Sequence, residues 1–290
     1  MVSIITINYN GWRDTCELIA SLKKFETHPY ELIVVDNASS HDDVVQIKQM
    51  YPETILICSD RNLGFAGGNN LGYQYAKGDY IFFLNNDMVV KGAILEPLIN
   101  CISMEKVGAA SPCVCYLYNC EQMQYYGYKQ LGKITLRHKT ESFDLSRRHD
   151  FEVSHETEVL YGGAMMVRRE VIEKVGKMSE IYFLFAEEFD WSNRIRTEGF
   201  KIWYEASSVV YHKGGASIGY GTPLRAYYMS RARLLFVRRN NDVVSKILAC
   251  MYLVGVSLTK NMLRALFNGD ISIAKALFRG TIYGLIDKKI

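Results

Sequence analysis

The chain has 290 residues, of which 49% are hydrophobic and 22% charged, so it can enclose a substantial core and is too apolar to be disordered. Its seven cysteines include no two pairs at zinc-ribbon spacing, which argues against a structural zinc framework. An odd number of cysteines without a secretory segment is typical of free thiols in a reducing cytosol. The N-terminus lacks a basic stretch followed by a long apolar core, so we expect no signal peptide.

The net charge of +3 is unevenly distributed along the chain. From Arg225 to the end there are 12 basic and 3 acidic residues, a balance of +9, and the preceding residues carry a balance of −6. A basic, apolar tail on an acidic body favours an anionic membrane surface as a partner and argues against nucleic acid. The alternative interpretation is a solvated basic helical face.

Strand and helix signals alternate over the first 110 residues. The pattern predicts strands at residues 3–8, 31–35, 54–58 and 79–84, helices at 14–24 and 44–50, and a glycine-rich segment at 62–72. Such βαβ units with apolar strands predict an α/β fold, in which helices flank a mostly parallel central sheet.

The second half of the chain is less regular at first. Residues 113–158 resemble an insertion or a mobile loop, after which regular periodicity resumes at 161–167. The pattern then predicts a helix at 187–197 and strands at 201–204 and 208–211. After Pro223 we expect helices to the end. The longest apolar run, 247–258, falls short of the roughly 20 residues of a membrane span. The apolar spacing at 261–286 predicts helices lying on a membrane, or packed on the body or on another subunit.

Polar residues follow three of the predicted strands directly. The clusters are Asn8-Tyr9-Asn10, Asp36-Asn37-Ala38-Ser39 and Asn85-Asn86-Asp87. One such cluster is ordinary turn chemistry. Ligands of open α/β sheets bind outside the carboxyl ends of the strands, so three clusters at successive strand ends predict a ligand site.

The glycine-rich segment at 62–72 and Asp87 of the third cluster suit phosphate and metal binding, respectively. Small residues in the glycine-rich segment would let backbone amides approach a phosphate, although both the P-loop and the dinucleotide fingerprint are absent. A tightly packed helix entry is the alternative. Asp87 ends an apolar strand, and a hard divalent ion bridging two phosphates would satisfy its carboxylate. A capping aspartate is the alternative there.

The motifs together resemble the family 2 glycosyltransferases, particularly the rhamnosyltransferase-like branch that builds bacterial surface polysaccharides. They are, in the order of that family, VSIITINYNG, ELIVVDNASSHD, RNLGFAGGNNLG, GDYIFFLNND, YGGAMMVRRE, FAEEFDWSNRIRTEGF and VVYHKGGAS, and they cover about residues 1–240. The resemblance implies a GT-A (nucleotide-diphospho-sugar transferase) fold, a nucleotide-sugar donor and inversion at the anomeric carbon. We expect a catalytic domain at 1–224, with a nucleotide-binding half at about 1–110 and an acceptor half at about 111–224, and a basic amphipathic helical tail at 225–290.

The resemblance also implies a role for each matching donor-site residue. Asp36 would contact the base, and Asn85-Asn86-Asp87 resembles the D-x-D motif, with Asp87 holding Mn²⁺ or Mg²⁺. Asn85 replaces the first acid of that motif, which leaves one anionic ligand fewer. His212 would approach the metal or the diphosphate, although a lone histidine at a strand end is more often structural. The other expected donor-site residues are Asn8, Tyr9, Asn10, Asn37, Asn62, Gly67, Asn69, Asn86 and Gly163.

Three acids resemble the E-D-x-D segment that carries the catalytic base of the family. The base maps to Glu188, where aspartate is usual, while Glu187 and Asp190 share another face of the predicted helix, so which acid reaches the acceptor stays open. An acidic helix start favoured by the dipole is the alternative. Small residues at 162–163 would leave room for a sugar, and Tyr161 and Trp191 could stack on sugars or belong to the core.

The expected activity is inverting, metal-dependent transfer from a UDP- or dTDP-sugar to a hydroxyl of a glycan or lipid-linked glycan, in cell-surface polysaccharide synthesis. We expect a cytoplasmic protein, peripheral on the inner face of the plasma membrane, whose tail binds membrane or forms a homodimer. A non-catalytic membrane scaffold and a sugar-1-phosphate nucleotidyltransferase are the alternatives. The loop at 8–13 lacks the glycine-rich, basic character usual in nucleotidyltransferases.

Overall fold

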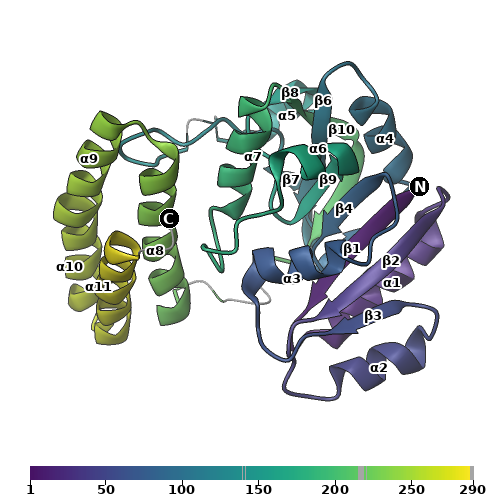
Figure 1. The fold of residues 1–290 in the computed structure, drawn as a ribbon, viewed down its shortest axis with the longest axis horizontal. Helices are drawn as coiled ribbons and strands as arrows, with labels where there is room; N and C mark the ends of the chain where they lie inside the picture. Colours follow the sequence, from purple (N-terminus) through teal and green to yellow (C-terminus); the bar gives the residue numbers. More distant parts are fainter. Residues whose placement is uncertain (139, 141, 215–218, 220, 288–290) are drawn as a thin grey trace.

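The computed structural model describes residues 1–138, 140, 142–214, 219 and 221–287. Figure 1 shows an α/β body and a separate group of helices beside it. In the first part of the body, strands and helices alternate as predicted. They are β1 (Val2–Asn8), α1 (Trp12–Phe25), β2 (Tyr30–Asp36), α2 (Asp43–Met50), β3 (Ile55–Cys58), α3 (Gly64–Tyr73), β4 (Tyr80–Leu84), β5 (Met88–Val90) and α4 (Leu95–Ile102).

The expectation of an irregular region at 113–158 is wrong for much of its length. The fully paired strand β6 runs into it and turns back in a hairpin with β7, and short helices and a strand follow. The strands predicted at 201–204 and 208–211 are one strand, β10, with a shift in its pairing to β6. The elements are β6 (Val107–Tyr116), β7 (Asn119–Tyr125), η1 (Leu145–Arg147), α5 (Arg148–Phe151), β8 (His155–Thr157), β9 (Ala164–Arg168), α6 (Arg169–Val175), α7 (Glu187–Thr197) and β10 (Lys201–His212).

The strands form one ten-stranded mixed sheet with the central order β3-β2-β1-β4-β9-β6-β10-β5. Strands β1 to β4 are parallel, and Asn8 lies directly opposite Asp36. Their carboxyl ends therefore meet at one edge, as the sequence predicted. At the other end of the sheet, β10 runs antiparallel to β5 with His212 opposite Met88, which brings His212 beside Asp87.

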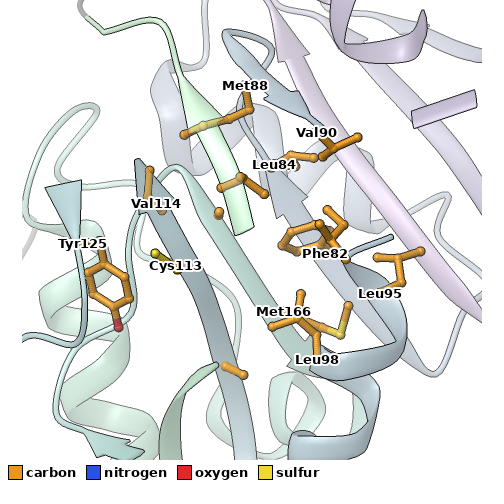
Figure 2. Packing of buried hydrophobic residues seen from close by; sticks show 14 of the residues in the cluster. Phe82, Leu84, Met88, Val90, Leu95, Leu98, Cys113, Val114, Tyr125 and Met166 are labelled. Atoms are coloured by element: carbon orange, nitrogen blue, oxygen red, sulfur yellow. The ribbon is translucent and has the colours of Figure 1, made fainter. Parts of the chain in front are cut away.

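Side chains of the sheet alternate between two apolar layers, because successive residues of a strand point to opposite faces. On one face Phe82 and Met166 pack with Leu95 and Leu98 of α4 (Figure 2). On the other face the strands pack with α3, α6 and α7, where Trp191 is buried in edge contact with a phenylalanine. Trp191 is therefore a core residue. Both faces are covered, which is usual for parallel strands with apolar sequences.

The residues after Pro223 are helical, as predicted. Helices α8 (Pro223–Asn240), α9 (Val243–Met251), η2 (Tyr252–Leu258), α10 (Thr259–Phe267) and α11 (Ile271–Ile286) form the group beside the body (Figure 1). Helix α11 lies along α8, and a Cβ on Gly280 would come within 2.2 Å of the Tyr227 carbonyl oxygen. Only a residue without a side chain permits this approach.

Helices α9, η2 and α10 form one continuous helix, Val243–Phe267, through the π-helical segment η2. Among the described residues it is the one helix long and apolar enough to cross a membrane by length and composition, with a mean hydropathy of 1.5. The helix is longer than the apolar run at 247–258 indicated. Only 11% of its most apolar window is buried. The exposed apolar residues of this helix include Val243, Ile247, Met251, Leu263 and Phe267.

Candidate active site at the carboxyl ends of the strands

The three polar clusters are joined in one buried hydrogen-bond network around Asn8. The fully buried Asn8 amide donates to Asp36 and to Asp43, at 2.9 Å each, and its oxygen accepts from Thr15 at 2.8 Å. The Thr15 hydroxyl in turn accepts from the Asn86 amide at 3.0 Å. Asn8 is therefore a buried residue that fixes the position of Asp36, and its place in the wall of a nucleotide pocket stays a prediction.

The neighbouring polar residues are divided between the surface and the entry to α3. Tyr9 and Asn10 are exposed, and Asn10 has a left-handed backbone with φ 53°. Asn37 donates to the Asn62 side chain at 3.1 Å and accepts from the Leu63 amide at 2.9 Å. The end of β2 thus holds the start of the glycine-rich helix in place.

The glycine-rich helix is closely packed. A Cβ on Gly67 would lie 2.7 Å from that of Leu63, and the buried Asn69 donates to the Phe65 carbonyl oxygen at 3.2 Å. This packing agrees with the tight helix entry considered as the alternative. Proximity of Asn62, Gly67 and Asn69 to ribose and phosphates stays a prediction.

Asp87 and His212 form a pair at the junction of the two halves. Asp87 is buried, its Oδ1 has no hydrogen-bond partner among the described residues, and its Oδ2 lies 3.1 Å from Nε2 of His212. On the other side of the ring, Nδ1 lies 2.7 Å from the Gln124 side-chain oxygen and 3.3 Å from the Tyr161 hydroxyl. The backbone N–H of Asn85 donates to the Gly163 carbonyl oxygen at 2.9 Å, near this pair.

This pair fits a divalent cation. The Gln124 oxygen can only accept, so Nδ1 of His212 donates to it, and in a neutral ring Nε2 then presents a lone pair to the Asp87 carboxylate. Two acceptors 3.1 Å apart need a positive charge, either a proton on Nε2 or a cation bound to both. The unpartnered Oδ1 of Asp87 adds a further ligand atom, and oxygen and imidazole donors suit Mn²⁺ or Mg²⁺. No cluster of three or more such residues occurs in the described parts of the chain, in keeping with Asn85 replacing an acid.

The three acids of α7 occupy different environments. Glu188 borders a pocket, and burial raises its pKa to about 7. Glu187 is buried with no described partner for its Oε2, and burial, followed by the charge of Glu188, raises its pKa well above the usual range. Asp190 is completely buried and bound by Arg194, Arg239, Tyr182 and Asn240. Asp190 ties α7 to α8, whereas Glu188 is placed for acid–base chemistry.

The turn before α7 is strained. Phe183, Phe185 and Ala186 all have left-handed backbones, with φ between 66° and 69°. Each such residue costs on the order of 1–3 kcal/mol and persists only where its surroundings hold it. The Phe183 carbonyl oxygen accepts from the Phe65 amide of α3 at 2.8 Å, which fastens the turn to the glycine-rich helix. The strain therefore lies directly between the expected donor site and the acids.

A pocket of about 490 Å³ opens beside Glu188, between the body and α8. Its walls are mainly apolar and aromatic: Tyr128, Leu131, Leu136, His138, Leu160, Tyr161, Gly162, Gly163, Phe185, Ala186, Glu188, Phe189, Met229, Ala232 and Arg233. A Cβ on Gly162 would lie 3.5 Å from the Glu188 carboxyl carbon, so this glycine borders the acid. At Gly163 a Cβ would clash with Met88 and Tyr161, so that glycine serves close packing.

Several residues at the site carry no sequence signal. Thr15 and Asp43 lie inside helices, Gln124 lies in the region interpreted as a loop, and Arg233 is one of many basic residues of the tail. Each becomes visible only when distant segments pair, as Gln124 does with His212 across 88 positions. The final residues of the 209–217 motif, 215–217, lie outside the described residues, as do residues 288–290 of the tail.

The sequence matches the profile described as "Glycosyl transferase family 2" over residues 3–176. The chain belongs to glycosyl transferase family 2. The resemblance seen in its motifs is confirmed by a match that contains the strand-end clusters and ends before α7.

Curated relatives support the assignment. The chain is 25% identical to the dTDP-rhamnosyl transferase RfbF of Shigella flexneri over 82% of this chain and 80% of that protein. It is 21% identical to the N-acetylglucosaminyl-diphospho-decaprenol L-rhamnosyltransferase of Mycobacterium tuberculosis, over 76% and 78% of the two chains. The chain is also 34% identical to the uncharacterized glycosyltransferase YwdF of Bacillus subtilis, over 30% of this chain and 32% of that protein. The chain thus spans only about a third of that relative.

Solved structures confirm the GT-A fold. GalNAc-T7 with UDP, GalNAc and Mn²⁺ superposes with a TM-score of 0.68 at 18% identity, over 99% of this chain and 56% of that one. The mannosyltransferase PcManGT of Pyrobaculum calidifontis, in complex with GDP-Man and Mn²⁺, has a TM-score of 0.59 at 16% identity, over 99% and 88%. At these identities the likeness shows the fold alone.

Proposed function

We propose that this glycosyltransferase moves a hexosyl or deoxyhexosyl group from a UDP- or dTDP-sugar to a hydroxyl of a lipid-linked glycan, with inversion, in cell-surface polysaccharide synthesis. Two relatives with rhamnosyltransferase names, one naming a dTDP donor and one a diphospho-lipid acceptor, support this class. The observation that carries the proposal is the placement of Glu188 in a pocket, with a pKa of about 7. A carboxylate of that pKa is suited to general-base catalysis near neutral pH.

Glu188 acts as the base in the proposed mechanism. Its carboxylate accepts the proton of the acceptor hydroxyl while that oxygen forms a bond to the anomeric carbon. The bond to the diphosphate oxygen breaks on the opposite side, which inverts the configuration. Burial raises the pKa of Glu187 beside it, which favours the uncharged form of that acid, and Asp190 orients the helix through Arg194 and Arg239.

A divalent ion would be held by Asp87 and His212. When bound, it supplies positive charge that stabilises the leaving diphosphate. Gln124 fixes the His212 ring so that Nε2 faces Asp87. The Mn²⁺ in both solved relatives supports this part of the proposal.

The tail would hold the enzyme on the cytoplasmic face of the membrane. The exposed apolar face of the helix Val243–Phe267 and the net charge of +9 after Arg225 support this placement. An apolar face with basic surroundings binds anionic bilayers by both burial and charge. Family membership leaves the nucleotidyltransferase alternative without support. A non-catalytic scaffold would not need Glu187 and Glu188 with raised pKa values, or the Asp87–His212 pair that suits a divalent cation.

Donor binding tests the proposal. We expect calorimetric titration with UDP-, dTDP- and GDP-sugars in Mn²⁺ to show metal-dependent binding of a UDP- or dTDP-sugar. Asp87→Ala should abolish that binding, because it removes the only carboxylate of the metal pair. Asp79→Ala, at an exposed carboxylate outside the site, is the matched control. Lack of binding by the folded wild type would instead favour the scaffold.

A further inference from the structure

The pocket beside Glu188 joins the catalytic body to the tail and contains one positive charge. Its walls come from the segments 128–138 and 160–163, the turn before α7, the start of α7, and helix α8. Among the described lining residues, the groups that can carry a charge near pH 7 are the carboxyl of Glu188, the guanidinium of Arg233 and the imidazole of His138. Burial lowers the pKa of His138, so it is neutral at pH 7. Arg233 is therefore the cation that a ligand in this pocket would meet.

Arg233 lies at the end of the pocket where body and tail meet. Its guanidinium donates to the Thr135 carbonyl oxygen at 3.0 Å and to the Ser257 hydroxyl of η2 at 3.2 Å. Both partners are neutral, and a guanidinium has five donors, so donors remain for an anion. The Arg233 guanidinium thus connects the segment 128–138 to η2 of the tail, and Arg233 also lines the pocket.

The charge of Arg233 is not compensated within the described chain. None of the described carboxylates forms an ion pair with it, although Arg231 and Arg239 of the same helix pair with Asp287 and Asp190. Burial lowers its pKa. A desolvated cation without a counter-charge is costly, and a bound anion would offset that cost.

We propose that Arg233 binds the diphosphate of a lipid-linked acceptor, and that this pocket holds the first acceptor sugar between Arg233 and Glu188. This inference rests on the proposed function and names the acceptor class and its anchor. Aromatic walls suit the apolar faces of a sugar, and a guanidinium suits phosphate oxygens. The lipid would leave the pocket beside η2, towards a tail whose exposed residues are largely apolar. An acceptor that carries a sugar, a diphosphate and a lipid would present one group each to the acid, the cation and the exposed apolar residues of the tail.

The test uses the full chain and three probes, farnesyl diphosphate, farnesol in detergent micelles and inorganic diphosphate, titrated calorimetrically in EDTA and the same detergent. We expect farnesyl diphosphate to bind more tightly than the other two. Arg233→Met should weaken its binding roughly 10–100-fold, the loss usual for a hydrogen-bonded charge pair. Arg233→Lys should recover part of the affinity. The matched control is Arg238→Met, on the same helix but bonded to the Gly284 carbonyl oxygen of α11.

Three outcomes would overturn the inference. Equal binding of farnesol would show that the anion contributes nothing. Equal binding of inorganic diphosphate would identify a free phosphate rather than a lipid as the ligand. Loss in Asp87→Ala but not in Arg233→Met would place the probe in the donor site.

Thermal unfolding separates ligand binding from a structural role. Removing an uncompensated buried charge should leave the Tm of Arg233→Met unchanged or raised, because no carboxylate loses its partner. A lowered Tm with unchanged probe affinity would assign Arg233 to holding the segment 128–138. Because these titrations use no nucleotide sugar, they can succeed or fail independently of the donor titration.

Discussion

At the scale of single residues, adjacent acids at the start of α7 differ in what they can do. The Glu188 carboxyl borders the pocket and has a pKa near 7, while Glu187 is more deeply buried with a pKa raised further. Because the pKa of Glu188 is raised, its carboxyl keeps the proton to a higher pH than an ordinary glutamate does. The base form of Glu188 therefore appears as pH rises through about 7. Below that value the acid cannot accept the acceptor proton.

We therefore predict that acceptor kcat/KM rises with pH through an inflection near 7. Glu188→Gln should lower transfer roughly 10²–10⁴-fold and remove the inflection, because the amide cannot accept the proton. Donor affinity should be unchanged. Glu187→Gln is the matched control and should keep the inflection. The base would be Glu187 if the two variants showed the reverse behaviour in a pH-rate profile.

The residues of the candidate site show how far motifs can predict a site. Asp87 and His212 were expected to meet at the metal, and the structure brings them within 3.1 Å. The motif could not separate Glu187, Glu188 and Asp190, because their roles depend on burial and on arginines from two helices. Gln124 could not be predicted, since glutamine in a polar stretch has no pattern that points to a histidine far along the chain.

At the scale of elements, close contact of α8 and α11 depends on glycine. We predict that Gly280→Ala lowers the Tm, because its Cβ would meet the Tyr227 carbonyl oxygen at 2.2 Å and the helices must separate. Overpacking of this kind costs roughly 1–3 kcal/mol. Gly255→Ala is the control, since nothing lies within 4 Å of its Cβ, and alanine there should keep or raise the Tm by its higher helix propensity. Equal effects of the two substitutions in thermal unfolding would contradict tight packing of α11.

Elements were predicted best where the period of apolar residues agrees with the final contacts. The helix at 187–197 was predicted at its observed limits, and the parallel strands of the first half were found within a few residues. The region 113–158 was misinterpreted because β7 and β8 are partly exposed and β8 is short, so their sequences lack a regular apolar pattern. Their strand character comes from pairing with β6 and β10, which are distant partners.

At the scale of the whole molecule, the tail combines two surfaces. Its inner side, from α8, binds Asp190 and lines the pocket, so the tail helps to complete the site as well as adding charge. Its outer side, the exposed side of Val243–Phe267, carries many apolar side chains. The length of this helix could not be interpreted from composition, because the helix continues beyond the apolar run at 247–258.

We predict that the outer side binds anionic bilayers. The full chain should sediment with vesicles that contain phosphatidylglycerol, and binding should weaken in high salt because the charge contribution is screened. Replacing Ile247, Leu263 and Phe267 together with Glu should abolish sedimentation, since each exposed side chain would lose its apolar contact with the lipid. Val45→Glu, at a similarly exposed apolar residue of α2, should sediment like the wild type. If the triple variant instead converts a dimer to a monomer in size-exclusion chromatography while vesicle binding is unchanged, this face joins two copies of the chain. The pocket beside Glu188 would then open towards a partner subunit rather than towards lipid.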